Sequence, residues 1–250
     1  MLRGSHPLLE RLLTIVLMVI FVASFLAYLA IQVMTEDVLN ARFYTRALER
    51  NRIYDRIYTD LLADPDNTLI VTVTAPQDSD IYGDFAGQDI EFVVIVCYPT
   101  TDDNPRPDYP LNPSQTDLVV PHMQTGSEAP LFADESVRYP VVVFSHGYMG
   151  SPITDDYFFA ISVLASHGYV VIAPFHGDLR FSNLMIEDLD DAIAVASNLE
   201  NFTAMQALRP LSISAALDLV LAHPQWQDHL DETRVGGFAV SMGGETMLRA

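Results

Sequence analysis

The sequence has 250 residues, half of them hydrophobic, which gives room for one sizeable domain with a buried core and excludes global disorder. Its formal net charge of −20 would repel phosphate backbones, so nucleic acid is not an expected partner. Cys97 is the single cysteine, which excludes an internal disulfide and a cysteine-based zinc cluster, and no metal or other cofactor is expected.

The first predicted element is a transmembrane helix over residues 12–35, after a short tail of residues 1–11. The stretch contains no charged residue and exceeds the roughly 20 residues that a helix needs to cross a bilayer. It lacks a clear small-residue cleavage site, so an uncleaved anchor is favoured over a cleaved signal peptide or a buried core helix. Arginines flank it on both sides, so the positive-inside rule leaves the orientation open. The sequence therefore predicts a single-pass membrane protein.

Residues 36–66 are predicted to form an amphipathic stalk helix. Apolar residues recur there at helical intervals, with arginines and acidic residues between them: Leu39, Phe43, Leu48, Ile53 and Ile57. A stalk that packs on the next domain is favoured over a binding element.

The remaining residues, 67–250, are predicted to form one α/β domain. It opens with two short β-branched runs, LIVTVTA (69–75) and IEFVVIVCY (90–98), which indicate a pair of strands. The acidic segment between them, DSDIYGDFAGQD, is interpreted as an ordinary turn. A calcium loop is disfavoured because tyrosine stands at its fifth ligand position and aspartate at its last.

From Tyr139 onward, strands and helices alternate along the sequence. YPVVVFSHG and YVVIAPF indicate buried strands separated by a helix that ends at Gly168. A second helix is expected to begin at Pro210, and TRVGGFAV indicates a third strand. This alternation predicts a mostly parallel sheet with helices on both faces. The stretch 178–208 has a helical pattern and is long enough to form a lid over a site.

The third parallel strand is expected to end at Ser241, on a tight turn into a helix. A serine hydroxyl needs a base, a carboxylate that orients the base, and donors for the developing oxyanion. A strand-to-helix turn exposes the hydroxyl and directs backbone N–H groups at the reacting carbonyl. The turn requires small residues two positions before and after the serine, which are Ala239 and Gly243. Gly244 is expected to let the helix pass close to the sheet.

The oxyanion donors are expected to be the backbone N–H groups of Met242 and Tyr148. Met242 directly follows the serine, and Tyr148 lies in the His-Gly turn after the first parallel strand. His146 in that turn is interpreted as a loop-shaping residue rather than a proton-transfer group.

Two segments resemble the α/β-hydrolase superfamily: PVVVFSHGYMGSPITDDYFFAISVLASHGYVVIAPFHGD, and RPLSISAALDLVLAHP with TRVGGFAVSMGGETML. The resemblance covers about residues 69–250. It is strongest to the branch of platelet-activating factor acetylhydrolases and dienelactone-hydrolase-like esterases. It implies the α/β-hydrolase fold, Ser241 as nucleophile, and Tyr148 and Met242 as oxyanion donors. Dienelactone hydrolases use a cysteine nucleophile, so Ser241 favours an esterase or lipase acting on small-molecule or lipid esters.

The acid and the histidine of the triad follow the serine in this fold, yet no aspartate or histidine follows Ser241. His223 and His229 precede the third parallel strand, at the wrong end of the sheet, and His176 matches a structural position in the family. We therefore expect the sequence to be the N-terminal part of a longer chain, with both partners beyond residue 250. The alternative is a non-catalytic, membrane-tethered binding or scaffold protein.

Overall fold

The computed structural model describes residues 24, 54, 57–110, 119–124, 127–181 and 189–250, without the side chains of residues 110, 155 and 189–200. The predicted transmembrane helix, 12–35, lies outside the described residues except for Ser24. Most of the predicted stalk, 36–66, also lies outside them, and its described part is helical over 57–63. The described residues from 54 onward belong to one compact unit, Asn51–Ala250.

A five-stranded sheet with the order β1-β2-β6-β5-β7 forms the centre of this unit. Its strands are β1 Ile70–Thr74, β2 Asp89–Cys97, β5 Tyr139–Ser145, β6 Val170–Pro174 and β7 Leu230–Ala239. β5 runs parallel to β6 and β7, whereas β2 runs antiparallel to β1 and β6. The described sheet is therefore mixed and not mostly parallel, because the predicted strand pair joins it through an antiparallel contact.

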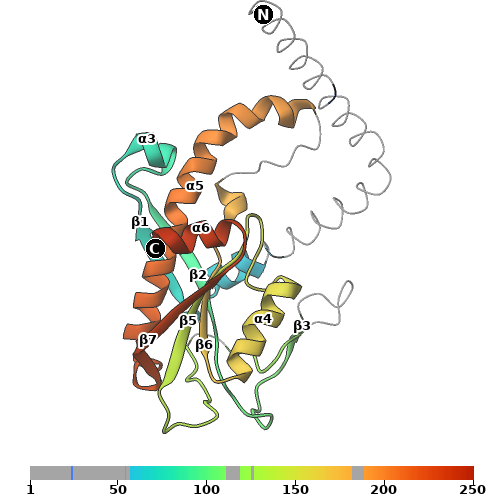
Figure 1. The fold of residues 1–250 in the computed structure, drawn as a ribbon, viewed down its shortest axis with the longest axis vertical. Coiled ribbons are helices and arrows are strands. Elements are labelled where there is room, and N and C mark those ends of the chain that lie inside the picture. The colour runs from blue at the N-terminus through green and yellow to red at the C-terminus, as the bar shows by residue number, and fades with distance from the viewer. Residues whose placement is uncertain (1–23, 25–53, 55–56, 111–118, 125–126, 182–188) are drawn as a thin grey trace, which may run out of the picture. The chain divides into compact units, whose positions relative to one another are not determined.

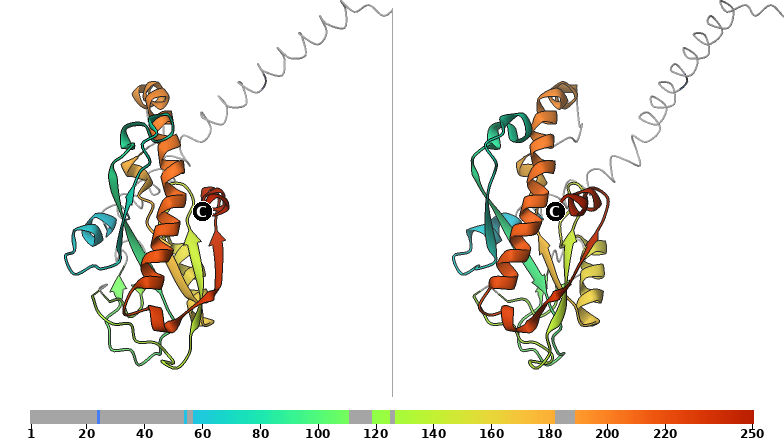
Figure 2. Two further views of the ribbon diagram at one scale, coloured as in Figure 1. Left: turned by 90° about the vertical axis from the view of Figure 1, so that its left-hand side faces the viewer. Right: turned by 60° about the vertical axis from the view of Figure 1, so that its left-hand side comes forward.

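Two helices cover opposite faces of the sheet, α4 (Asp155–Ser166) and α5 (Leu189–Ala222) (Figures 1 and 2). Side chains of β6 alternate between the faces: Val170 and Ile172 pack in the cluster that includes α5 residues, and Val171 packs in the cluster that includes α4. Burial on both faces explains the continuous apolar sequence of this strand. A third helix, α6 (Met242–Arg249), contacts α5 and β7.

Helix α5 begins much earlier than the sequence predicts. Pro210 lies inside the helix instead of at its start. A proline there removes one backbone hydrogen bond, but buried residues on both sides, such as Met205 and Ala216, hold the helix on the sheet. Of the predicted lid, residues 182–188 lie outside the described residues, and the rest contains η2 (Asp178–Arg180) and the first half of α5.

One described helical segment, Asn201–Ala222 of α5, is long and apolar enough to cross a bilayer. Half of it is buried inside the protein, and core helices share this composition, so it is weak support for a membrane span.

Several short elements complete the described chain. The acidic segment after β1 forms α3 (Ser79–Tyr82) and η1 (Gly83–Phe85), and the Asp78 carboxylate caps α3 by accepting a hydrogen bond from the backbone N–H of Asp80 at 3.1 Å. β3 (Tyr109–Pro110) pairs with β4 (Val119–Val120), and η3 (Gln227–His229) precedes β7.

Candidate active site

Ser241 lies between the end of β7 and the start of α6, as the sequence predicts, with φ 54° and ψ −122°. A positive φ is strained for any residue other than glycine. Two hydrogen bonds hold the turn: Val240 N–H donates to Ser145 O at 3.2 Å, and Gly243 N–H donates to Val240 O at 2.9 Å. The serine side chain is exposed at this turn, so its hydroxyl is accessible to a substrate.

Gly243 is the glycine that permits the close approach of α6 to the sheet. A Cβ atom at this position would lie 2.0 Å from the carbonyl oxygen of Ser145, so no side chain fits. A Cβ atom on Gly244 would meet nothing within 4 Å. The prediction that Gly244 allows this approach is therefore wrong, because residue 244 faces away from the end of β5.

The loop that follows β5, residues 146–150, passes beside the serine, and we call it the oxyanion loop. Gly150 N–H donates to Gly147 O at 3.1 Å and closes a turn. A Cβ atom on Gly147 would lie 3.5 Å from the Cβ atom of Ser241. The structure thus brings the loop that contains Tyr148 next to Ser241, while Met242 begins α6 on the following residue.

His146 is fully buried and shapes the oxyanion loop, in agreement with the interpretation from sequence. Its Nε2 atom accepts a hydrogen bond from the backbone N–H of His176 at 3.2 Å. This hydrogen bond at Nε2 assigns the ring proton to Nδ1, which lies 2.8 Å from Gly147 O as donor and 3.3 Å from Arg209 Nη2. Burial, and then the positive charge of Arg209, lowers the pKa of His146 to about 4, so the ring is neutral near pH 7.

His176 is also buried, and both of its ring nitrogens are engaged away from Ser241. Nε2 accepts from the hydroxyl of Ser145 at 2.8 Å, and Nδ1 donates to Ser212 Oγ at 3.1 Å. The Ser212 hydroxyl in turn donates to the backbone oxygen of Arg209 at 2.8 Å. Burial holds the pKa of His176 well below its ordinary value. His176 therefore has a structural role in this arrangement.

An ion pair behind the oxyanion loop, Asp178–Arg209, was missed by the sequence reasoning. Arg209 Nη2 and Nε donate to the two carboxylate oxygens of Asp178 at 2.9 and 3.0 Å, and each side chain is only 1% exposed. Asp178 Oδ2 accepts from Met149 N–H at 2.8 Å, and Arg209 Nη2 donates to Gly147 O at 3.2 Å. An arginine inside an apolar helical stretch was the signal that could have identified it, because buried charges require partners.

No histidine or carboxylate among the described residues is hydrogen-bonded to Ser241. His223 contacts Thr68 Oγ1 at 3.3 Å, and His229 contacts Glu135 at 3.3 Å. Both histidines precede β7 and so lie at the opposite end of that strand from Ser241, as the sequence predicts.

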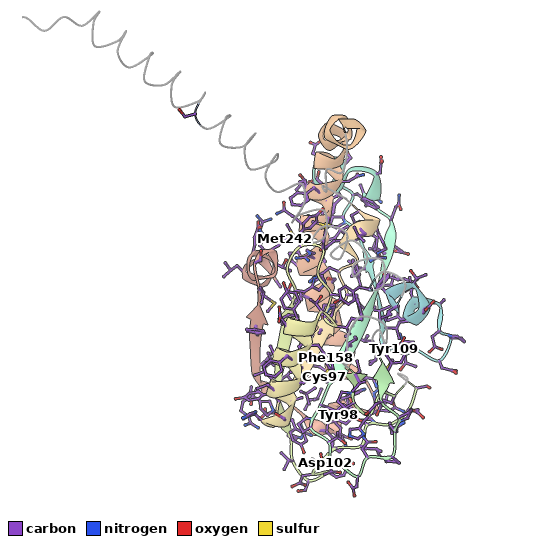
Figure 3. All side chains as sticks on the ribbon, turned by 90° about the vertical axis from the view of Figure 1, so that its right-hand side faces the viewer. Cys97, Tyr98, Asp102, Tyr109, Phe158 and Met242 are labelled. Atoms are coloured by element: carbon purple, nitrogen blue, oxygen red, sulfur yellow. The ribbon has the colours of Figure 1, made fainter. Side chains whose placement is uncertain are left out.

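A cavity of about 380 Å³ lies elsewhere, between β2, α4 and the β3–β4 pair. Cys97, Tyr98 and Phe158 line it, and Figure 3 shows them far along the strands from Met242. Neither Ser241 nor Tyr148 lines this cavity. Loss of solvation raises the pKa of the Cys97 thiol to about 12, so the thiol is unreactive near neutral pH.

Comparison with known proteins gives one family match and several similar structures. A family model for chlorophyllase matches residues 120–223. Dienelactone hydrolase from Anabaena variabilis is 14% identical, with a TM-score of 0.34 over 72% of this chain and 56% of its own. Ferulic acid esterase from Streptomyces cinnamoneus is 22% identical, with a TM-score of 0.45 over 74% of this chain and 55% of its own. The chain thus spans little more than half the length of these structures. A search of curated proteins finds no match.

Proposed function

We propose that the chain is a member of the α/β-hydrolase superfamily and, on that premise, a serine carboxylic-ester hydrolase. The observation that carries the proposal is the exposed Ser241 in a strained conformation between β7 and α6. This is how such enzymes present their nucleophile. The chlorophyllase match adds support, because residues 120–223 include the oxyanion loop.

In the proposed reaction, Ser241 Oγ attacks the ester carbonyl carbon and the carbonyl oxygen becomes an oxyanion. The backbone N–H groups of Tyr148 and Met242 donate hydrogen bonds to that oxyanion. The serine proton passes through a histidine to the departing alcohol, which leaves an acyl-serine ester. Water then attacks this ester and releases the acid, which restores the serine hydroxyl.

We propose that chain beyond residue 250 contributes the histidine and its carboxylate. In support, no described histidine is hydrogen-bonded to Ser241, and both ring nitrogens of His176 are engaged by serines of β5 and α5.

We also propose that the substrate is a lipid ester, in the manner of the platelet-activating factor acetylhydrolases that the sequence resembles. The predicted membrane segment, residues 12–35, would keep the site near lipid. Hydrolysis of an acetylated phospholipid in detergent micelles, compared with hydrolysis of p-nitrophenyl acetate, which has the same acyl group, tests this choice. A preference for the water-soluble acetate ester would contradict it.

A fluorophosphonate probe on the full-length protein tests the nucleophile. The probe should label the wild type, and Ser241→Ala should abolish labelling, since removal of a triad member costs several orders of magnitude in rate. Ser145→Ala is the matched control, because it removes a buried hydroxyl from the neighbouring strand. Labelling that persists in Ser241→Ala would move the nucleophile elsewhere. An unlabelled wild type would favour the membrane-tethered binding or scaffold protein.

A further inference from the structure

The turn in the oxyanion loop has a strained residue at its third position. The turn runs from Gly147 to Gly150 and is closed by their backbone hydrogen bond, and Met149 has φ 55°. A positive φ at the third position is the mark of a type II turn, which usually has glycine there. Rotation of the Tyr148–Met149 peptide would give a type I turn, with Met149 at a negative φ and the closing hydrogen bond retained.

Asp178 opposes that rotation. Its Oδ2 atom accepts a hydrogen bond at 2.8 Å from Met149 N–H, which belongs to the peptide that would rotate. The carboxylate is 1% exposed, so no solvent would replace the lost donor. A buried carboxylate that loses a donor is unfavourable, and Asp178 therefore favours the strained form of the turn.

Arg209 fixes the other side of the turn and orients Asp178. The two hydrogens of Nη2 go to Gly147 O and to Asp178 Oδ2, and the Nε hydrogen goes to Asp178 Oδ1. Nη1 is buried and has no hydrogen-bond partner among the described residues. The guanidinium group thus donates hydrogen bonds to the turn itself and to the carboxylate that holds the turn.

We propose that the buried Asp178–Arg209 pair is a positioning device for the oxyanion hole. The pair holds the backbone on both sides of Tyr148, whose N–H is one of the proposed oxyanion donors, so the inference rests on the proposed function. Neither side chain is proposed to touch the substrate. Because the oxyanion develops only in the transition state, a misplaced donor lowers kcat and leaves KM nearly unchanged.

Asp178→Asn in the full-length protein is the first test. We expect kcat to fall by about 10-fold or more, toward the roughly 10²–10³-fold cost of losing one oxyanion donor, with little change in KM. Hydrogen–deuterium exchange should become faster in the peptide that spans residues 145–151. Val220→Ala is the control, because it removes buried methyl groups from the same helix α5 and should lower stability without either effect.

A second substitution separates positioning from general stability. Glycine adopts φ 55° without strain, so Met149→Gly added to Asp178→Asn should restore part of the lost kcat. If Asp178→Asn does not fold, Arg209→Lys serves instead. It keeps the charge but cannot make the same paired hydrogen bonds, and it should lower kcat in the same direction.

Three outcomes would overturn the proposal. The first is an unchanged rate of hydrogen–deuterium exchange in residues 145–151 of Asp178→Asn. The second is a loss of kcat no greater than in Val220→Ala. The third is no recovery of kcat when Met149→Gly is added to Asp178→Asn. A wild-type protein that neither hydrolyses esters nor reacts with fluorophosphonate would contradict the proposed function but not the role of the ion pair in holding the loop. The exchange comparison of Asp178→Asn with Val220→Ala would still test whether the pair holds the loop.

Discussion

Ser241 occupies a backbone conformation that costs about 1–3 kcal/mol for a non-glycine residue. Its neighbours offset that cost: Val240 N–H bonds to the end of β5, and Gly243 sits so close to Ser145 that only a hydrogen atom fits there. The strained backbone of Ser241 and the close contact of Gly243 have one cause, because the chain changes from a strand to a helix within a few residues.

Gly243→Ala should destabilise the protein, since the added methyl group would lie 2.0 Å from a backbone oxygen that cannot rotate away. We expect a loss of about 1–3 kcal/mol or more in the free energy of unfolding, together with loss of fluorophosphonate labelling. Gly244→Ala is the matched control. Its methyl group meets open space, and alanine is favoured over glycine within a helix by up to about 1 kcal/mol. Equal urea midpoints for the two variants would contradict this account.

His146 predicts how stability depends on pH. Its pKa in the folded protein is about 4, below the ordinary value of 6.5, so the unfolded chain takes up a proton first as the pH falls. The stabilisation is complete above pH 6.5, is lost progressively between pH 6.5 and 4, and changes no further below that. The full loss is about 3 kcal/mol.

His146→Gln should make the free energy of unfolding less dependent on pH over that interval, because glutamine does not titrate. His176 shifts in the same direction, so some dependence should remain. Urea denaturation of wild type and variant at pH 7 and pH 4.5 checks this. A variant with the full wild-type dependence would show that His146 is not responsible.

At the scale of elements, β7 is an edge strand of the described sheet, and apolar side chains along it are exposed. Val235 is 41% exposed and Phe238 is 38% exposed. An edge that presents apolar side chains beside unpaired backbone groups favours association between chains.

Val235→Lys should therefore reduce the aggregation of a shortened protein of residues 37–250, with a change in stability within about 0.5 kcal/mol, as for other surface positions. Val143→Lys, at a 2% exposed position in β5, should unfold the same protein. Light scattering and thermal unfolding measure the two effects. In a longer chain whose next strand covers β7, Val235→Lys should instead be destabilising, so the pair of measurements also tests the expected extension.

The sequence predicted most elements well because their signals are local. The apolar runs of β5, β6 and β7 and the glycine after α4 mark the ends of those elements to within a few residues. The early start of α5 was missed because tertiary burial outweighs the penalty of Pro210. The antiparallel contact of β2 with β6 was missed because it depends on segments distant in the chain.

The candidate site likewise has one part that the sequence predicted and one part that it did not. The turn at Ser241 was readable because strand, serine and glycines are consecutive residues. The Asp178–Arg209 pair was not, because the two residues are 31 positions apart, and only the folded packing of α5 against the end of β6 brings them together.

At the scale of the whole molecule, the uncharged segment at residues 12–35 predicts a membrane-anchored protein. Full-length protein should remain with membranes through alkaline carbonate washing and should require detergent for release, because burial of an apolar helix outlasts the removal of electrostatic contacts. A shortened protein that begins at residue 37 should be released. Carbonate release of the intact protein would contradict the anchor.

The two buried histidines, His146 in the oxyanion loop and His176 beside it, have one more consequence. Each carries its proton on Nδ1 and donates it to a fixed acceptor, Gly147 O for His146 and Ser212 Oγ for His176. Imidazole protons that are shielded from water in this way exchange slowly enough to give separate downfield proton NMR resonances. The protein thus carries two native spectroscopic labels beside its candidate site. Their chemical shifts would report ligand binding at the loop without the introduction of any foreign group.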